Sequence, residues 1–248
     1  MRHPSGERSL SAGRPPPRVA APGVGEGYPE AMCGRFTLTT TDLDGLARQL
    51  RAELDPAFRR PWRPRFNVAP GDAHVVLRAE GGGRVLGEAT FGFATGTGTG
   101  RTINARVESA ARRPTFREEW RARRCAVPAD GFFEWSGPQG ARRPAWLHRP
   151  DGRPLLFAAL WRPAPDGARE FVIVTVDANA DVRELHERMP AILADGALDA
   201  WLDGGEPPAL APEGTLAARA VSPRVNSVKN DDPACLDPPP TDPQLPLL

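Results

Sequence analysis

Several features that define other protein classes are scarce or absent in this chain. Only three of its 248 residues are cysteines. Cys33, Cys125 and Cys235 are too far apart in sequence to form metal-ligand pairs, and an odd number of widely spaced cysteines is typical of a reducing compartment. We therefore expect a cytoplasmic protein with no metal site and no organic cofactor.

The chain also lacks a long apolar run. Nothing in it approaches the roughly 20 apolar residues of a membrane span, and the segment after Met1 has no apolar core of a secretory signal. The formal net charge of +1 argues against a protein that coats nucleic acid through bulk charge. These absences indicate a globular chain, which is long enough for one large domain. We expect no membrane partner.

Lysine is nearly missing, since Lys229 is the only one. A Schiff base would therefore need Lys229 or the N-terminal α-amine. Lys229 lies with Asn226 and Asn230 in a polar turn that suits a phosphate. Arginine is abundant: between Arg101 and Cys125 there are eight arginines and three glutamates, a local charge of +5. This stretch is either a solvated face or a phosphate-binding strip.

Hydrophobic periodicity predicts many strands and few, short helices. The expected strands are 33–39, 74–79, 84–93, 103–107, 124–128, 132–136, 144–149, 154–161, 170–176 and 218–222. The expected helices are 43–50, capped by Asp42, then 114–121, 180–187 and 196–203. Residues 61–71 and 95–100 are expected to be loops, and His74 and His148 surface positions. This pattern indicates an α+β fold with a curved, mostly antiparallel sheet.

The two ends of the chain differ from the middle in composition. Residues 1–31 are rich in Pro, Gly and Arg without periodicity. They are either a disordered leader or the result of a mis-assigned start. We favour Met32 as the initiator because the codons for Glu26-Gly27 resemble a ribosome-binding site. The expected domain is 32–237, followed by a Pro-rich tail over 238–248.

Cys33, in Met32-Cys33-Gly34-Arg35-Phe36, is the first candidate for chemistry. Loss of Met32 would give Cys33 a free α-amine beside its thiol. An α-amine has a pKa near 7.7–8.0, so roughly 10–15% is neutral at pH 7, far more than for a lysine. After imine formation, the thiol could close a five-membered thiazolidine ring intramolecularly. The alternative is a small, buried apolar cysteine.

Three other stretches contain polar residues suited to catalysis. Glu134 follows a glycine and lies among aromatic residues that would raise its pKa into the range for general acid/base work; the alternative is an exposed strand glutamate. His186 is the best proton-transfer candidate; the alternative is a helix-terminal cap. Asn104 and Arg106 alternate, so both point to one face, where Asn104 could hold a polar substrate group and Arg106 a phosphate.

These stretches, in this order, resemble the SOS response-associated peptidase (SRAP) family of HMCES-like abasic-site proteins. The matching pieces are Met32–Phe36, Phe66–Pro70, Ile103–Arg106, Ala129–Trp135, Leu185–Pro190 and Ser222–Asn230. The resemblance implies one α+β domain with a twisted, barrel-like sheet. It also implies a monomer that captures abasic sites in single-stranded DNA and is nucleoid-associated when bound.

The resemblance also implies roles for individual residues. Cys33, once Met32 is removed, is the nucleophile that forms a thiazolidine, and Asn104 orients it. Glu134 assists sugar ring opening and the α-amine, and His186 stabilises or protonates the opened sugar. The implied DNA-binding residues are Arg35, Asn67, Arg106, Phe116, Arg117, Thr175, Asn226 and Lys229, among which Phe116-Arg117 resembles a wedge and Thr175 lines the pocket.

Two other functions stay open. One is a thiol (auto)peptidase that uses Cys33 as nucleophile and His186 as base and removes the leader. The other is a non-catalytic DNA-binding module that uses the arginine-rich stretch. One departure from the family concerns Phe91–Gly98, which lacks tryptophans usual there and so loses stacking of about 1–3 kcal/mol per base.

Overall fold

Two twisted β-sheets, a two-stranded ribbon and a few short helices form the part of the chain that the computed structural model describes, residues 33–58, 60–96, 100–138, 140–204 and 209–240. The strands are β1 (Phe36–Leu38), β2 (Glu53–Leu54), β3 (Arg65–Val68), β4 (Ala73–Glu80), β5 (Gly83–Phe91), β6 (Phe93–Ala94), β7 (Arg101–Thr102), β8 (Asn104–Arg106), β9 (Arg124–Ala129), β10 (Gly131–Ser136), β11 (Arg143–His148), β12 (Leu155–Pro163), β13 (Arg169–Asp177), β14 (Arg188–Pro190) and β15 (Ala217–Ala220). The helices are α1 (Leu43–Gln49), α2 (Val107–Ala110), α3 (Arg117–Ala122), α4 (Leu198–Leu202) and the 3₁₀ turns η1 (Pro223–Asn226) and η2 (Pro233–Leu236). Expectations for 1–31, for the Met32 start, for 97–99 and for the tail beyond 240 lie outside the described residues.

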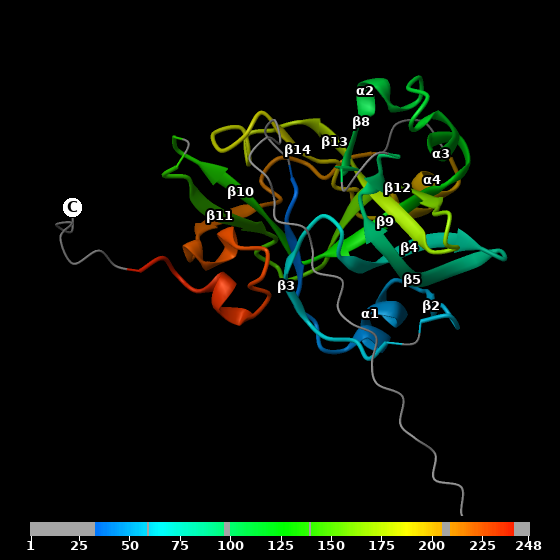
Figure 1. Cartoon of the computed structure of the whole chain (residues 1–248), viewed down its shortest axis with the longest axis horizontal. Coiled ribbons are helices and arrows are strands. Elements are labelled where there is room, and N and C mark those ends of the chain that lie inside the picture. Colours follow the sequence, from blue (N-terminus) through cyan, green and yellow to red (C-terminus); the bar gives the residue numbers. More distant parts are fainter. Residues whose placement is uncertain (1–32, 59, 97–99, 139, 205–208, 241–248) are drawn as a thin grey trace, which may run out of the picture.

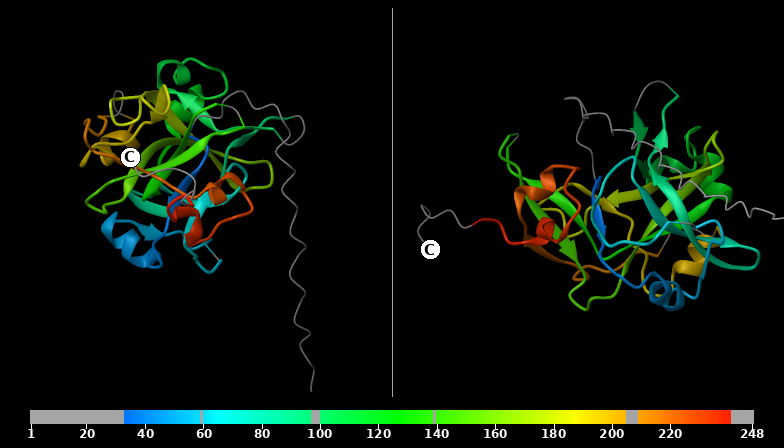
Figure 2. Two further views of the ribbon diagram at one scale, coloured as in Figure 1. Left: turned by 90° about the vertical axis from the view of Figure 1, so that its left-hand side faces the viewer. Right: turned by 60° about the horizontal axis from the view of Figure 1, so that its bottom comes forward.

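The larger sheet closes on itself. Its order is β14-β13-β12-β9-β4-β5-β2, and β5 also pairs in parallel with β13 through Phe91↔Phe171, so five strands form a ring (Figures 1 and 2). Phe36, Phe91 and Phe157 fill its interior edge to face, with ring centroids 5.6 and 6.0 Å from Phe36, at separations typical of favourable aromatic pairs. The predicted fold class, α+β with a twisted, mostly antiparallel, barrel-like sheet and peripheral short helices, is confirmed.

The smaller sheet, β15-β11-β10-β1-β3, carries the start of the described chain. The segment 222–237, which contains η1 and η2, packs on this sheet and forms a second apolar cluster with Phe133, Val225 and Cys235. Figure 1 shows this segment in orange and red below β10 and β11. It is called the C-terminal strap below.

Some expected elements are different in the structure. The helix predicted over 180–187 is wrong: residues 181–185 form turns. The side chain of Asn179 accepts from Asp181 N, and the Asp181 carboxylate accepts from Gly214 N and Leu216 N, so local and tertiary side-chain bonds replace the helix. Val107, predicted to end the strand over 103–107, instead begins helix α2.

Two further predictions differ from the structure because of tertiary contacts. The loop expected at 61–71 contains β3, which pairs with β1 at Val68↔Phe36. His74 is 2% exposed rather than a surface residue. The predicted cap of α1 is confirmed, since Asp42 Oδ1 accepts from Gly45 N at 2.7 Å. No helix in the described residues is long and apolar enough to cross a lipid bilayer.

Candidate functional site

The antiparallel pairing of β1 with β10 brings Cys33 to Glu134. Phe36 lies opposite Phe132, so the residues just before β1 face the end of β10. Glu134 is two residues beyond Phe132 and shares its face of the sheet. The main-chain nitrogen of Cys33 donates to Glu134 Oε1 at 3.0 Å.

Cys33 is held in an unusual environment. It is 2% exposed, and its φ of 46° is in the left-handed region, which costs a non-glycine residue free energy. Its Sγ lies 4.0 Å from the carbonyl oxygen of Arg188. Burial first, and then the charge of Glu134, raises the pKa of the Cys33 thiol, while the positive charge of Arg188 acts the other way. The thiol in this site is therefore protonated at neutral pH.

Glu134 is the buried carboxyl of the site, only 3% exposed. Burial raises its pKa, and the hydrogen bonds from Cys33 and the charge of His186 oppose the shift. At Gly131, a Cβ would lie 2.2 Å from Trp146 Nε1, so only glycine permits this packing at the start of β10. A carboxyl with a raised pKa beside an N–H group is suited to proton transfer.

One residue, Arg188, holds both His186 and the thiol. Its backbone N–H donates to His186 Nδ1 at 3.0 Å, which leaves Nε2 of a neutral imidazole as the protonated nitrogen. Its guanidinium donates to Glu108 at 2.7 and 3.0 Å, to Asp177, and to the Thr175 carbonyl at 2.9 Å. The main chain of Arg188 therefore contacts both His186 and the Cys33 thiol. Its side-chain bonds hold that main chain in place.

Strand β13 brings Asn104 beside this cluster. Thr175 pairs with Arg106 of β8 and with Pro190 of β14, so β8 and β14 lie on the two sides of β13. Asn104 Nδ2 and Thr175 Oγ1 are buried and have no hydrogen-bond partner among the described residues. Buried polar atoms are rarely left unpaired, and two of them next to one reactive cluster are available to a ligand.

Arg35 and Asn67 hold the C-terminal strap. Arg35 Nη1 donates to Asn67 Oδ1 at 2.9 Å and to the Val225 carbonyl at 2.7 Å. Asn67 is 0% exposed, and its Nδ2 lies 3.2, 3.1 and 2.8 Å from the carbonyls of Val225, Ser227 and Asn230. The Arg35 guanidinium also lies over the ring of Trp135, the neighbour of Glu134, at 5.4 Å. The polar groups of Asn67 are thus fully used inside the protein.

The other expected DNA-binding residues differ in exposure. Phe116 is 2% exposed and packs 6.2 Å from Phe93, so a wedge at this point would be formed by other atoms than the Phe116 ring. Its neighbour Arg117 is exposed. Arg106, Asn226 and Lys229 are also exposed, and Asn226 Oδ1 accepts from Trp135 Nε1 at 2.8 Å.

Sequence reasoning missed Arg188, Glu108 and Trp135 as parts of the site. Arg188 lies inside the stretch that contains His186, and that position is the only signal that could have identified it. Glu108 and Trp135 enter through contacts between distant segments, at 80 and 91 residues of separation. No group of three or more His, Cys, Asp or Glu side chains among the described residues could hold a metal ion.

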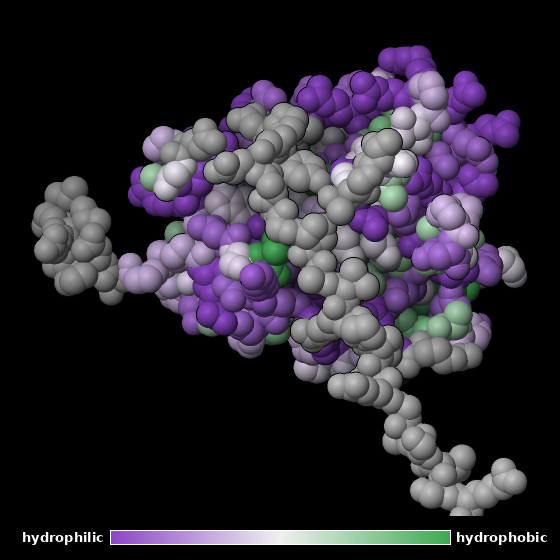
Figure 3. All heavy atoms as spheres, in the orientation of Figure 1, coloured by the Kyte–Doolittle hydropathy of each residue, from purple (hydrophilic) through white to green (hydrophobic). Residues whose placement is uncertain are grey.

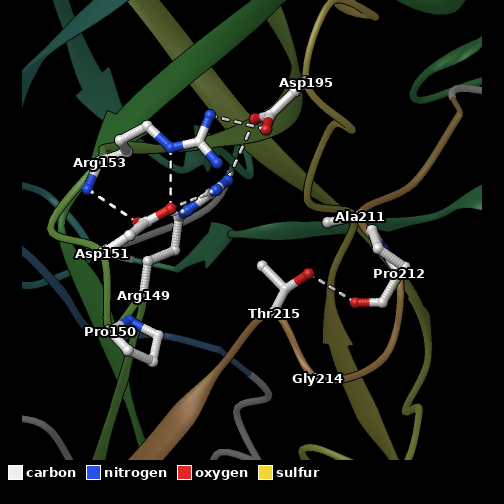
Figure 4. A pocket seen from close by; sticks show the side chains of 9 residues that line it. All are labelled: Arg149, Pro150, Asp151, Arg153, Asp195, Ala211, Pro212, Gly214 and Thr215. Carbon is white, nitrogen blue, oxygen red and sulfur yellow. Dashed lines mark hydrogen bonds and ion pairs between the residues drawn. The ribbon is translucent and has the colours of Figure 1, made fainter.

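A separate concavity of about 420 Å³ lies away from this cluster (Figure 4). It is lined by Arg149, Pro150, Asp151, Arg153, Asp195, Ala211, Pro212, Gly214 and Thr215. Its two arginines and two aspartates bind one another at 2.8 to 3.1 Å, so its charges are already compensated.

Comparison with known proteins agrees with the motifs. The family model of the SOS response associated peptidase (SRAP) matches residues 32–228. The abasic site processing protein YedK of Escherichia coli (strain K12) is 34% identical over 84% of this chain and 100% of its own. The abasic site processing protein HMCES of Gallus gallus is 30% identical over 84% of this chain and 78% of its own.

Solved structures have the same fold. A Bordetella bronchiseptica protein has a TM-score of 0.62 and 25% identity, and covers 77% of this chain and 100% of its own. A Bacteroides thetaiotaomicron protein has a TM-score of 0.69 over 83% of this chain and 99% of its own. At 18% identity, the second likeness concerns the fold alone.

Proposed function

The chain belongs to the SOS response associated peptidase (SRAP) family, and on that premise we propose that it captures abasic sites in single-stranded DNA covalently through Cys33. Two relatives are named abasic site processing proteins. The observation that carries the proposal is the 3.0 Å bond from the Cys33 main-chain nitrogen to the buried carboxyl of Glu134, with the thiol of the same residue beside it. The protein acts in the cytoplasm as a monomer on the chromosome.

In the first step, the amine of Cys33 attacks the aldehyde carbon of the opened deoxyribose. Once the chain begins at Cys33, the nitrogen beside Glu134 is an α-amine. As it attacks, Glu134 accepts one amine proton and passes it to the aldehyde oxygen, which gives a carbinolamine. Glu134 then transfers the second amine proton to the new hydroxyl, which leaves as water as the imine forms, so no oxidant or reductant is needed.

In the second step, the thiol closes the ring. Sγ adds to the imine carbon, and the thiol proton moves to the imine nitrogen, which gives a thiazolidine. The raised pKa of the Cys33 thiol keeps it protonated until the imine is present, so the amine reacts first. The intramolecular addition has a large effective molarity.

The surrounding residues hold the sugar and its phosphate. His186, with Nδ1 occupied by the Arg188 N–H, presents Nε2–H to the oxygen released when the sugar ring opens. The unpaired amide of Asn104 and hydroxyl of Thr175 bind the hydroxyls or phosphate next to the lesion. Exposed Arg106, two residues from Asn104, binds a phosphate.

The test is a denaturing-gel shift on abasic single-stranded DNA with protein that begins at Cys33. Wild type forms a stable adduct. Cys33→Ala and Cys33→Ser both keep the α-amine but lack the thiol, so neither forms a stable adduct, and each forms an imine that survives only after borohydride reduction. Cys125→Ala, another buried cysteine, is the matched control. Equal crosslinking by Cys33→Ala, or by a chain that retains residues 1–32, refutes the proposal.

A second candidate activity, thiol autopeptidase, is favoured by the same contact. Glu134 holds the nitrogen that would be the leaving amine if the bond between Met32 and Cys33 were cleaved. Sγ would attack the Met32 carbonyl with His186 as base, and water would hydrolyse the acyl intermediate. Intact mass of protein expressed from Met1 tests this activity: we expect loss of residues 1–32 that stops in Glu134→Gln and in His186→Ala. Unchanged processing in both variants refutes self-cleavage.

A further inference from the structure

Asp130, the single residue between β9 and β10, binds strand β1 through both its carboxylate and its backbone. The carboxylate accepts from the Thr37 hydroxyl, and from the backbone N–H and the hydroxyl of Thr39 at 2.6 and 2.5 Å. The backbone N–H of Asp130 donates to the Thr37 carbonyl at 3.0 Å. Trp146 Nε1 donates to the same Thr37 hydroxyl at 3.1 Å, and Thr37 is 0% exposed. The end of β1 is therefore bound to the start of β10 by a buried polar cluster.

The apolar pattern of β1 does not fix its position along β10. The strand has only three residues, and both Phe36 and Leu38 are buried. A slip of two residues keeps every side chain on its own face of the sheet, and it replaces one apolar residue by the other. Pairing with β3 is irregular between Phe36 and Leu38, and the Arg35 side chain binds β3 and the C-terminal strap, on the edge of β1 away from β10. The register against β10 therefore needs a determinant of its own.

This register decides where Cys33 lies. Phe36 faces Phe132, and the same register, continued toward the start of β1, brings the Cys33 nitrogen to 3.0 Å from Glu134 Oε1. A slip of two residues would move Cys33 along the sheet by about 6.6 Å. A misplacement of only about 1 Å can cost a reaction about a hundredfold in rate.

We propose that Asp130 is a positioning residue for the capture of abasic sites. By holding Thr37 and Thr39, it selects the register of β1 that puts the amine of Cys33 on Glu134. Asp130 acts through β1 and does not touch the lesion. This inference rests on the proposed function and assigns a cause to the contact that carries it.

The expected DNA contacts belong to other elements. Arg106 is in β8 and Arg117 in α3, which lie in the upper right part of Figure 1, where hydrophilic residues cover the surface in Figure 3. Because Asp130 is bound to β1 instead, it should change the rate of the covalent step and leave the affinity for DNA as it is.

The test measures single-turnover crosslinking of protein that begins at Cys33, over a range of concentrations of abasic single-stranded DNA. Asp130→Ala should lower the rate constant at saturating DNA at least about tenfold, and the concentration that gives half of this rate should change by less than about twofold. The matched control is Asp151→Ala. Asp151 is also an aspartate between two strands, and its carboxylate accepts from a backbone N–H and from arginine side chains, so this variant loses comparable bonds and should crosslink as wild type does.

Substitutions of Thr39 test the proposed route from Asp130 to β1. Thr39→Ser keeps the hydroxyl and should react as wild type does. Thr39→Val keeps the shape, loses the hydroxyl and should crosslink more slowly. In Asp130→Ala, Thr39→Val should have no further effect, because both substitutions remove the same bond.

The register itself is observed without DNA. Nuclear Overhauser contacts between the backbone protons of Phe36 and Phe132 should be present in wild type and in Asp151→Ala, and should lose intensity in Asp130→Ala. If Asp130→Ala does not fold, Thr39→Val serves for both measurements. Unchanged contacts, an unchanged rate at saturating DNA, or an equal effect of Asp151→Ala overturns the inference. Failure of wild type to crosslink refutes the proposed function instead, and the contacts still report the register.

Discussion

Asn67→Ala should destabilise the protein because the side chain of Asn67 fastens the C-terminal strap. Its carboxamide accepts a charge-assisted bond from Arg35 and shares its two N–H groups among the carbonyls of Val225, Ser227 and Asn230. A hydrogen bond to a charged group contributes about 1.5–3 kcal/mol, and each neutral bond about 1 kcal/mol. With these groups left buried and unpaired, we expect the free energy of unfolding to fall by about 3.5–5 kcal/mol.

Urea denaturation followed by circular dichroism measures this change. The control is Asn230→Ala, which loses one exposed side-chain bond, from Nδ2 to the Arg224 carbonyl at 2.7 Å, and should cost less than about 1 kcal/mol. A loss below about 1 kcal/mol for Asn67→Ala would refute the reasoning. If stability were unchanged while DNA affinity fell, Asn67 would be a DNA contact, as the family resemblance implies.

Three further predictions concern buried ionisable groups. Burial raises the pKa of Glu134, so ionisation of this carboxyl at neutral pH opposes folding. Glu134→Gln should therefore have a higher melting temperature than wild type at pH 7, and the difference in melting temperature should disappear below the ordinary carboxyl pKa near 4. Equal melting temperatures at pH 7 would contradict this. Burial lowers the pKa of His74 from 6.5 to about 3, so as the pH falls below 6.5 the unfolded state binds a proton that the folded state does not. The free energy of unfolding should therefore drop by about 2 kcal/mol at pH 5. In denaturant titrations from pH 7 to 4.5, the free energy of unfolding of His74→Leu should depend less on pH than that of wild type. Glu170 accepts from Ala94 N and from two arginines, Arg101 and Arg162, so Glu170→Gln should increase hydrogen exchange at the Ala94 amide at least tenfold, while exchange in β12 stays unchanged.

The sequence predicted β12 and β13 of the barrel because each is a continuous apolar run with the length of a buried strand. It did not predict β3 or β14, since both are short and form only because a distant strand offers hydrogen-bond partners. The predicted helix at 180–187 failed for a similar reason: Asp181 finds the backbone N–H groups of Gly214 and Leu216 more than 30 residues later. Patterns within a short window contain no information about such contacts.

The candidate site was partly predictable for the same physical reasons. Motif residues Cys33, Glu134 and His186 were named from the sequence, and the pairing of β1 with β10 and the backbone of Arg188 bring them together. The hydrogen-bonding roles of Arg35 and Asn67 were not predictable. Their partners are backbone carbonyls of the C-terminal strap, and every residue has such a carbonyl, so the sequence does not identify the partners. Burial of His74 depends on packing against Phe36 and Trp62, which only the folded chain creates.

The hydrogen bond from Arg35 to the Val225 carbonyl joins two residues that are 190 positions apart in sequence. A ribosome makes Arg35 early in synthesis and the C-terminal strap almost last. Until residues 222–237 emerge, Arg35 lacks its carbonyl partners and the strand after Cys33 is not anchored at that point. In a nascent chain, the segment around Cys33 therefore lacks this anchor until synthesis is nearly finished.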